Sequence, residues 1–188
     1  SCEGAGSAAL PPPPGVLGVW GIRSSSFPPK ARVFYGMSIA ALDKIFDEFM
    51  PDLIVTVDCG ISNAEEVAYA QEQGAYVIVT DHHELPDRLP DCITINPKFD
   101  DDYPYDNLCG AGVAFKLATA LLGEEAEQFV DFAALSTVAD SVPLLGENRD
   151  IVAEGLRRIE KHPRPAFSAL LGKTGETTAQ SLAFSVAP

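Results

Sequence analysis

Two adjacent histidines, His82 and His83, follow Asp81 at the end of an apolar run in the string VIVTDHHELP. The whole chain has only three histidines. Imidazole rings are costly to bury without polar partners, whereas imidazole and carboxylate groups together are good ligands for Mn²⁺, Zn²⁺ or Fe²⁺. The triplet therefore predicts a role in binding a metal ion or a phosphate group.

Two further aspartates, Asp58 and Asp140, could either bind a ligand or serve a purely structural role. Asp58 follows the apolar run LIVTV, and an aspartate in such a place more often caps the next helix. Asp140 ends an apolar helical segment, where its charge opposes the helix dipole. Either a bound cation or the nearby Arg149 would compensate for that charge. Similarly, Gly110 and Gly112 could offer N–H groups to a phosphate or simply allow a helix to pack closely.

Short β-branched runs predict the strands that would position these side chains. The runs are LIVTV, AYVIVT and CITIN, at residues 53–57, 75–80 and 92–96. A helix is expected between the first two strands, and it should open with the capping-box spacing of Ser62 and Glu65. Strand, helix and strand at this spacing predict a βαβ unit with parallel strands.

The ends of these strands are the expected place of the chemistry. In parallel sheets, ligands bind outside the carboxyl ends of the strands. Asp58 and the triplet that begins at Asp81 both follow such ends. We therefore expect these side chains to converge on one crevice, although they lie far apart in the sequence.

The remaining periodicity is mainly helical. An amphipathic helix is expected after the N-cap candidate Ser38 and before Pro51. The fold class is therefore α/β, with a parallel sheet of βαβ units flanked by helices and a mostly helical C-terminal half. In that half, helices are expected at residues 110–122, 124–140, 148–161 and 165–175.

Composition and charge restrict the class of protein. The chain has 188 residues and a formal net charge of −14, which argues against broad contact with a nucleic-acid backbone but permits a local basic groove or an acidic metal site. No apolar run approaches the ~20 residues of a membrane span, and the Pro-rich start lacks the basic region of a secretory signal. We expect a cytoplasmic protein without membrane contact. Residues 1–30, rich in Pro, Gly and Ser, predict a tail or linker.

Five strings occur in an informative order and spacing: LIVTVDCGIS, VIVTDHHELP, NPK, LCGAGVAFKLA and STVADSVPLLGENR. Together, over about residues 33–188, they resemble the DHH phosphoesterases and, within them, the RecJ-like exonucleases specific for single-stranded DNA. The resemblance implies a partial DHH phosphoesterase domain at residues 31–188, after a non-family tail at 1–30. Its sheet core would span about 31–110 and its helical part about 111–188.

The resemblance also gives each candidate residue a role in a site for two divalent ions, Mn²⁺ or Mg²⁺. Asp58 would bridge the two ions, and His82 and Asp140 would be further ligands. His83 would contact the scissile phosphate, with Asp81 as an orienting residue in the same motif. The implied activity is metal-dependent hydrolysis of phosphodiester bonds, 5′ to 3′ on single-stranded DNA, in DNA repair and recombination. The implied partners are single-stranded DNA and a single-strand-binding protein or helicase.

One motif of that family is absent from the sequence. The family's first motif, D-x-D, supplies further metal ligands from well upstream of the position of Asp58, but no aspartate precedes Asp43 here. We therefore expect an incomplete metal site and impaired hydrolysis. Two alternatives stay open: another DHH phosphoesterase acting on pyrophosphate, oligonucleotides or cyclic dinucleotides, and a catalytically inactive DHH scaffold.

Overall fold

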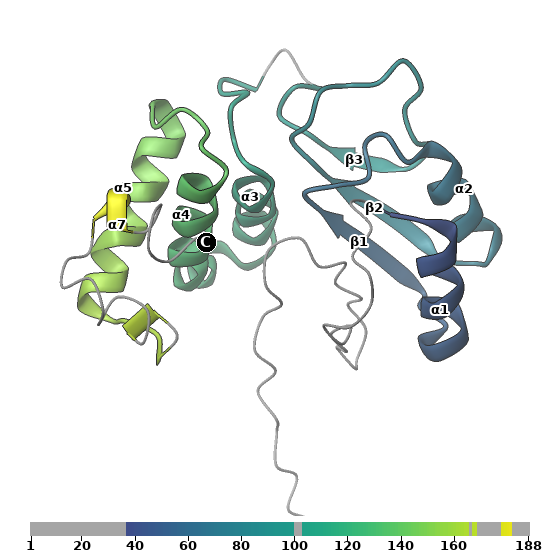
Figure 1. The fold of residues 1–188 in the computed structure, drawn as a ribbon, viewed down its shortest axis with the longest axis horizontal. Helices are drawn as coiled ribbons and strands as arrows, with labels where there is room; N and C mark the ends of the chain where they lie inside the picture. The colour runs from purple at the N-terminus through teal and green to yellow at the C-terminus, as the bar shows by residue number, and fades with distance from the viewer. Residues whose placement is uncertain (1–36, 100–102, 166, 169–177, 182–188) are drawn as a thin grey trace, which may run out of the picture.

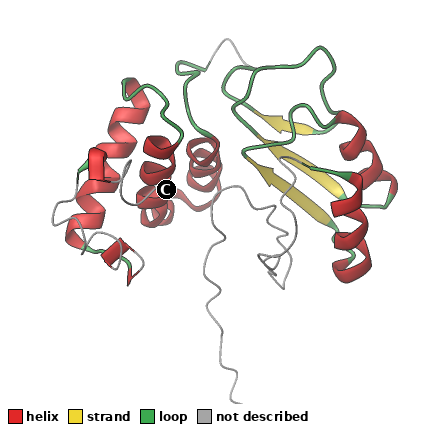
Figure 2. Ribbon diagram, in the orientation of Figure 1, coloured by secondary structure: helices red, strands yellow, loops and turns green. Residues whose placement is uncertain are grey.

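The computed structural model contains a parallel sheet with two helices on one face and a helical half beside it (Figures 1 and 2). It describes residues 37–99, 103–165, 167–168 and 178–181. The tail predicted at residues 1–30 lies outside these ranges. The α/β fold class predicted from the sequence is confirmed.

Three strands form the sheet, in the order β1-β2-β3. Neighbouring strands are parallel, and helix α2 connects the first two, so the predicted βαβ unit is confirmed. Val57 pairs with Thr80 and Thr80 pairs with Ile95, so the three strands end side by side. The bounds are Leu53–Val57 for β1, Ala64–Glu72 for α2, Tyr76–Thr80 for β2 and Ile93–Ile95 for β3.

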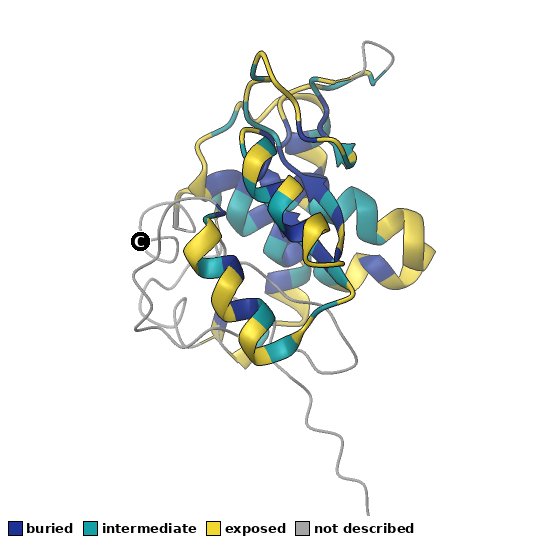
Figure 3. Cartoon of the chain, turned by 90° about the vertical axis from the view of Figure 1, so that its right-hand side faces the viewer, coloured by how far each residue is buried: buried dark blue, intermediate teal, exposed yellow. Residues whose placement is uncertain are grey.

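Helices α1 (Ile39–Phe49) and α2 cover the same face of the sheet (Figure 1). Helix α1 begins where the sequence predicts, because the hydroxyl of Ser38 accepts a hydrogen bond of 3.4 Å from the N–H of Ala41. Apolar residues between these helices and the strands are buried, as the dark blue positions in Figure 3 show. This burial fixes the strands, and hence their carboxyl ends, in place. The cluster consists of Met37, Leu42, Ile45, Ile54, Val67, Ala70, Ala75, Val77 and Val79.

The start of helix α2 differs from the prediction. Its N-cap is Asn63, without a side-chain cap hydrogen bond, so the predicted capping box of Ser62 and Glu65 is wrong. The Asn63 amide instead donates a hydrogen bond of 3.0 Å to the carbonyl of Met37, at the start of the described chain. A tertiary contact between segments far apart in sequence thus replaces the local cap.

The second half is helical, as predicted, but one helix is divided. A continuous helix was expected over residues 124–140, whereas a 3-10 helix, η1 (Gly123–Phe129), precedes α4. Ala126 is the buried residue of η1, so this segment lacks the apolar stripe that supports an α-helix. The expected helix at 165–175 falls largely outside the described residues. The helices are α3 (Gly110–Leu122), α4 (Val130–Ala139), α5 (Gly146–Lys161) and the short α7 (Ala179–Ser181).

A second buried cluster holds this helical half together. Its central contact is between α4 and α5, where Gly155 lies close to Ala134. Within the described residues, no helix has both the length and the apolar character needed to cross a membrane. The cluster consists of Leu108, Val113, Val130, Ala133, Ala134, Val138, Ile151, Val152, Ile159 and Phe167.

Candidate metal centre

Asp58 directly follows β1, in a tight turn that is stabilised by hydrogen bonds. Its backbone is left-handed, with φ of 65°, and its N–H donates to the carbonyl of Thr80 at 3.0 Å. The hydroxyl of Thr56 donates to the carbonyl of Cys59 at 2.7 Å, which closes the turn. Since the N-cap of α2 is Asn63, Asp58 does not cap that helix. The interpretation of Asp58 as a helix cap is therefore wrong.

Asp81 lies at the end of β2, and its buried carboxylate accepts several hydrogen bonds. Its Oδ2 accepts from the N–H of Ile61 at 3.0 Å. Its Oδ1 accepts from the N–H groups of His82 and His83, at 2.8 and 3.3 Å, and lies 2.7 Å from Nδ1 of His83. Burial alone would raise the pKa of Asp81, but these hydrogen bonds hold it below its usual value. A charged Asp81 therefore holds the backbone of both histidines and the ring of His83.

The ring of His82 lies between two carboxylates. Its Nε2 is 3.0 Å from Oδ1 of Asp58 and 3.6 Å from Oδ2 of Asp140. The Asp58 carboxylate raises the pKa of His82, burial opposes this effect, and the charge of Asp140 adds to it. Oδ1 of Asp58 is buried and has no well-aligned hydrogen bond. Two carboxylates and one imidazole thus converge on one place.

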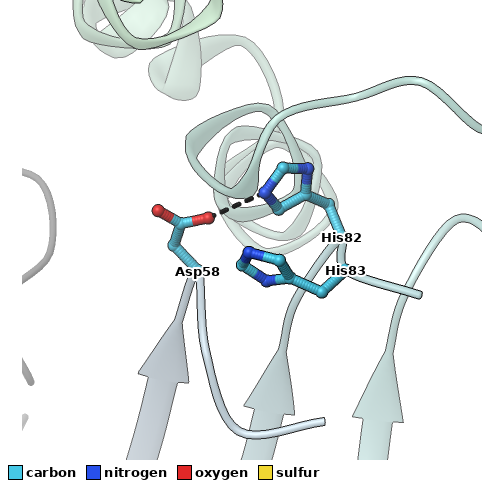
Figure 4. A group of neighbouring side chains, drawn as sticks. All are labelled: Asp58, His82 and His83. Carbon is cyan, nitrogen blue, oxygen red and sulfur yellow. Dashed lines mark ion pairs between the residues drawn. The ribbon is translucent and has the colours of Figure 1, made fainter. Parts of the chain in front are cut away.

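Figure 4 shows how Asp58, His82 and His83 come together from the ends of adjacent strands. Each of these residues offers one ligand atom, and these atoms lie within 4.8 Å of one another. Such a set of oxygen and nitrogen donors fits Mn²⁺ and related ions, and a cation there would satisfy the buried oxygen of Asp58. The expected convergence of the two strand ends is therefore observed.

Asp140 reaches this cluster from the C-terminal end of α4. Its side chain is 41% exposed, and its N–H continues the helix by donating to Ser136. The sequence left two candidates for the charge that compensates Asp140, a bound cation and Arg149. Among the residues that the structure describes, Arg149 forms no ion pair with Asp140. The positive partner that the structure brings to Asp140 is His82. His82 thus supplies a compensating charge when it is protonated, and the same position would allow a bound cation to do so.

Asn96 was not identified from the sequence as a site residue. It is buried after β3, and its amide donates to the carbonyl of His83 at 2.9 Å. Its Oδ1 accepts from the N–H of Lys98 at 2.9 Å. Asn96 therefore fixes the backbone of the histidine pair from the neighbouring strand. Its place at the end of a predicted strand, like those of Asp58 and Asp81, was the available signal.

The two glycines at the start of α3 differ in their surroundings. The N–H of Gly112 donates to Sγ of Cys109 at 3.3 Å, so this group is not free for a phosphate. Gly110 lies directly against the side chain of Asp58. For Gly110, close packing is thus the interpretation that the structure favours.

Comparison with known proteins identifies the family of this fold and site. The model described as "DHH family, N-terminal domain" matches residues 21–139. The single-stranded-DNA-specific exonuclease RecJ of Bacillus subtilis is 45% identical over 142 residues, which are 72% of this chain and 18% of that protein. RecJ of Escherichia coli K12 is 39% identical over 169 residues, which are 80% of this chain and 29% of that protein. The chain thus spans less than a third of either relative.

Two solved structures agree with the fold. An exonuclease RecJ bound to manganese has a TM-score of 0.73 and 36% identity, over 82% of this chain and 40% of that one. RecJ of Thermus thermophilus in complex with Mn²⁺ has a TM-score of 0.71 and 35% identity, over 80% of this chain and 24% of that one. A further structure of that protein contains Mg²⁺. The family resemblance seen in the sequence is confirmed: this chain belongs to the DHH family.

Proposed function

We propose that this chain forms the metal-binding core of a phosphodiesterase that degrades single-stranded DNA from 5′ to 3′, in DNA repair and recombination in the cytoplasm. The observation that carries the proposal is the position of His82, whose Nε2 lies 3.0 Å from Asp58 and 3.6 Å from Asp140. The names of the relatives support the nuclease activity and the choice of single-stranded DNA. A single-strand-binding protein or a helicase would be a partner in that setting.

Asp58, His82 and Asp140 would hold the ion, Mn²⁺ or Mg²⁺. A divalent cation supplies Lewis-acid chemistry, polarising a phosphoryl oxygen and neutralising its negative charge. Two carboxylates and an imidazole suit this task because they combine negative charge with donor atoms that Mn²⁺ accepts. Asp58 Oδ1, buried and without an aligned hydrogen bond, is a second support for this assignment.

His83 would contact the scissile phosphate. Its Nδ1 is engaged by Asp81 at 2.7 Å, so Nε2 is the ring nitrogen left for a substrate. The His83 side chain is 43% exposed, whereas that of His82 is 14% exposed, which suits contact with substrate for the first and with metal for the second. The Asn96 amide and the Asp81 carboxylate keep this ring and its backbone in one orientation. The two adjacent histidines thus have different proposed roles.

We further propose that hydrolysis by these 188 residues is impaired, because the sequence contains no D-x-D motif before Asp58. Metal binding and hydrolysis are therefore measured separately. In the first experiment, the purified chain is equilibrated with Mn²⁺ and the bound ion is counted by calorimetry. We expect about one ion per chain, and none in an Asp58→Ala, His82→Ala double variant. An unaltered count in the double variant would refute the proposed site, and no bound ion in the original chain would refute it and favour the inactive scaffold.

The second experiment compares substrates. With Mn²⁺, we expect slow release of mononucleotides from 5′-phosphorylated single-stranded DNA, further reduced by His83→Ala, and little hydrolysis of pyrophosphate or a cyclic dinucleotide. Faster hydrolysis of either small substrate would assign the chain to the alternative DHH phosphoesterase class. Robust degradation of DNA that His83→Ala abolishes would contradict the proposed impairment while supporting the site.

A further inference from the structure

The first residue of α3, Gly110, is buried against the side chain of Asp58. A Cβ atom added to Gly110 would lie 2.3 Å from Oδ1, 2.5 Å from Cβ and 2.6 Å from Cγ of Asp58. Atoms at such distances overlap, so a side chain at Gly110 and the observed Asp58 carboxylate cannot occupy this space together. The contact joins two residues that are far apart in sequence.

Hydrogen bonds hold the backbone on both sides of this contact in place. The turn of Asp58 is held by its N–H bond to Thr80 and by the bond from Thr56 to Cys59. Helix α3 is held at its N-cap, Cys109, whose Sγ accepts from Gly112 within the helix. The same Sγ lies 3.4 Å from the hydroxyl of Thr137 in α4. The overlap includes Cβ of Asp58, so rotating the carboxylate alone would not relieve it, and a larger residue at Gly110 would shift Asp58 as a whole, its carboxylate included.

The direction of that carboxylate matters because its Oδ1 is the atom 3.0 Å from Nε2 of His82. We propose that Gly110 is a positioning residue of the metal centre: it leaves the space in which the Asp58 carboxylate faces His82. This inference rests on the proposed metal site.

A purely structural role would have a different consequence. If Gly110 served only to pack α3 against the sheet, a substitution would lower the stability of the fold, and the folded molecules would still bind metal normally. If Gly110 positions Asp58, the folded variant binds metal more weakly. Metal affinity measured on folded protein separates these two roles.

The test compares Gly110→Ala with Gly112→Ala in the full chain. Gly112 is also buried in the first turn of α3, but its added Cβ would make an ordinary contact of 3.4 Å with Leu108. After circular dichroism has established folding, Mn²⁺ binding is measured by calorimetry. We expect Gly110→Ala to weaken binding by about tenfold or more, as displaced supports of metal ligands do, and Gly112→Ala to change it by less than about twofold. Equal affinities for Gly110→Ala and the original chain would overturn the inference.

A second comparison serves if Gly110→Ala fails to fold. All three crowded atoms belong to the Asp58 side chain, so Asp58→Gly removes them, and glycine tolerates the positive φ at this position. We expect Gly110→Ala to destabilise the chain strongly in the original background and only weakly in the Asp58→Gly background. Equal destabilisation in both backgrounds would place the strain elsewhere and overturn the inference. Absence of Mn²⁺ binding in the original chain would instead refute the metal site, and the role of Gly110 with it.

Discussion

Nδ1 of His83 lies 2.7 Å from Oδ1 of Asp81, and the Asp81 side chain is only 1% exposed. The same carboxylate accepts N–H groups from Ile61, His82 and His83. A group that fixes the turn after β1 and the turn after β2 also sets the orientation of the proposed phosphate-binding ring. Asp81 therefore links the stability of the fold to the geometry of the proposed site.

Replacing Asp81 by Asn should reveal its contribution to stability. The folded-state pKa of Asp81 is lowered, so its contribution to stability is present above the unfolded-state value, about 3.9, and is lost as pH falls through the folded-state value. We expect Asp81→Asn to lower the free energy of unfolding at neutral pH by about 1–3 kcal/mol and to make stability less dependent on acid. Urea unfolding at several pH values measures this.

The control for that experiment is Asp87→Asn, which alters an exposed aspartate of the same segment. We expect it to leave both the stability at neutral pH and the acid dependence close to those of the original chain. An acid profile for Asp81→Asn as steep as that of the original chain would contradict the assignment.

Metal binding should depend on pH through His82. A proton on Nε2 competes with a metal ion, and the raised pKa keeps this proton bound to higher pH than in an ordinary histidine. The affinity for Mn²⁺ should therefore rise with pH through that pKa and level off above it. Calorimetry between about pH 6 and 8 tests this, with His162→Ala, at the end of α5, as the control that keeps the dependence. Affinity that does not change with pH would contradict the role of His82 as a ligand.

The sequence was sufficient to predict the sheet and which side chains meet at its edge. β-Branched runs identified the three strands, and the rule that parallel strands end at one edge brought Asp58 together with the Asp81 triplet. These inferences succeeded because they depend on local pattern and on a general property of parallel sheets. The roles taken from the family resemblance still need the metal-binding and nuclease experiments.

Contacts between distant segments could not be predicted in the same way. The cap at Asn63 depends on Met37, and the position of Gly110 depends on Asp58. Such contacts depend on how the helices pack against the sheet. The periodicity of a single sequence does not predict that packing. The 3-10 helix at Gly123–Phe129 was not predicted for a related reason. Apolar spacing alone does not distinguish a 3-10 turn from the start of an α-helix.

The packing of α4 on α5 should tolerate no side chain at Gly155. A Cβ atom there would lie 2.2 Å from Cβ of Ala134 and 2.8 Å from the carbonyl oxygen of Val130. We expect Gly155→Ala to lower the free energy of unfolding by about 1–3 kcal/mol, the usual penalty of overpacking. Thermal unfolding measures it, with Gly112→Ala as a buried helical glycine that has room for a methyl group. Equal unfolding temperatures for the two variants would show that the helices can separate slightly.

Asn148 should matter to both stability and the metal centre. It is fully buried, and its amide donates to the carbonyl of Asn107 at 2.7 Å and to that of Pro143 at 3.0 Å. These carbonyls belong to the segment that leads into Gly110 and to the segment that follows Asp140. One side chain thus ties together the two segments that bring α3 and Asp140 to the site.

Asn148→Ala removes both donors and leaves two carbonyls without them, so we expect a loss of about 2 kcal/mol or more in the free energy of unfolding. Because Asp140 then loses its support, Mn²⁺ affinity of the folded variant should also fall. The matched control is Asn107→Ala, which removes an exposed side chain and keeps the backbone carbonyl that Asn148 uses. Urea unfolding and calorimetry measure the two effects. A variant that lost stability but kept its Mn²⁺ affinity would show that Asn148 supports the helical half alone, since Asp140 would then hold its position without the tie.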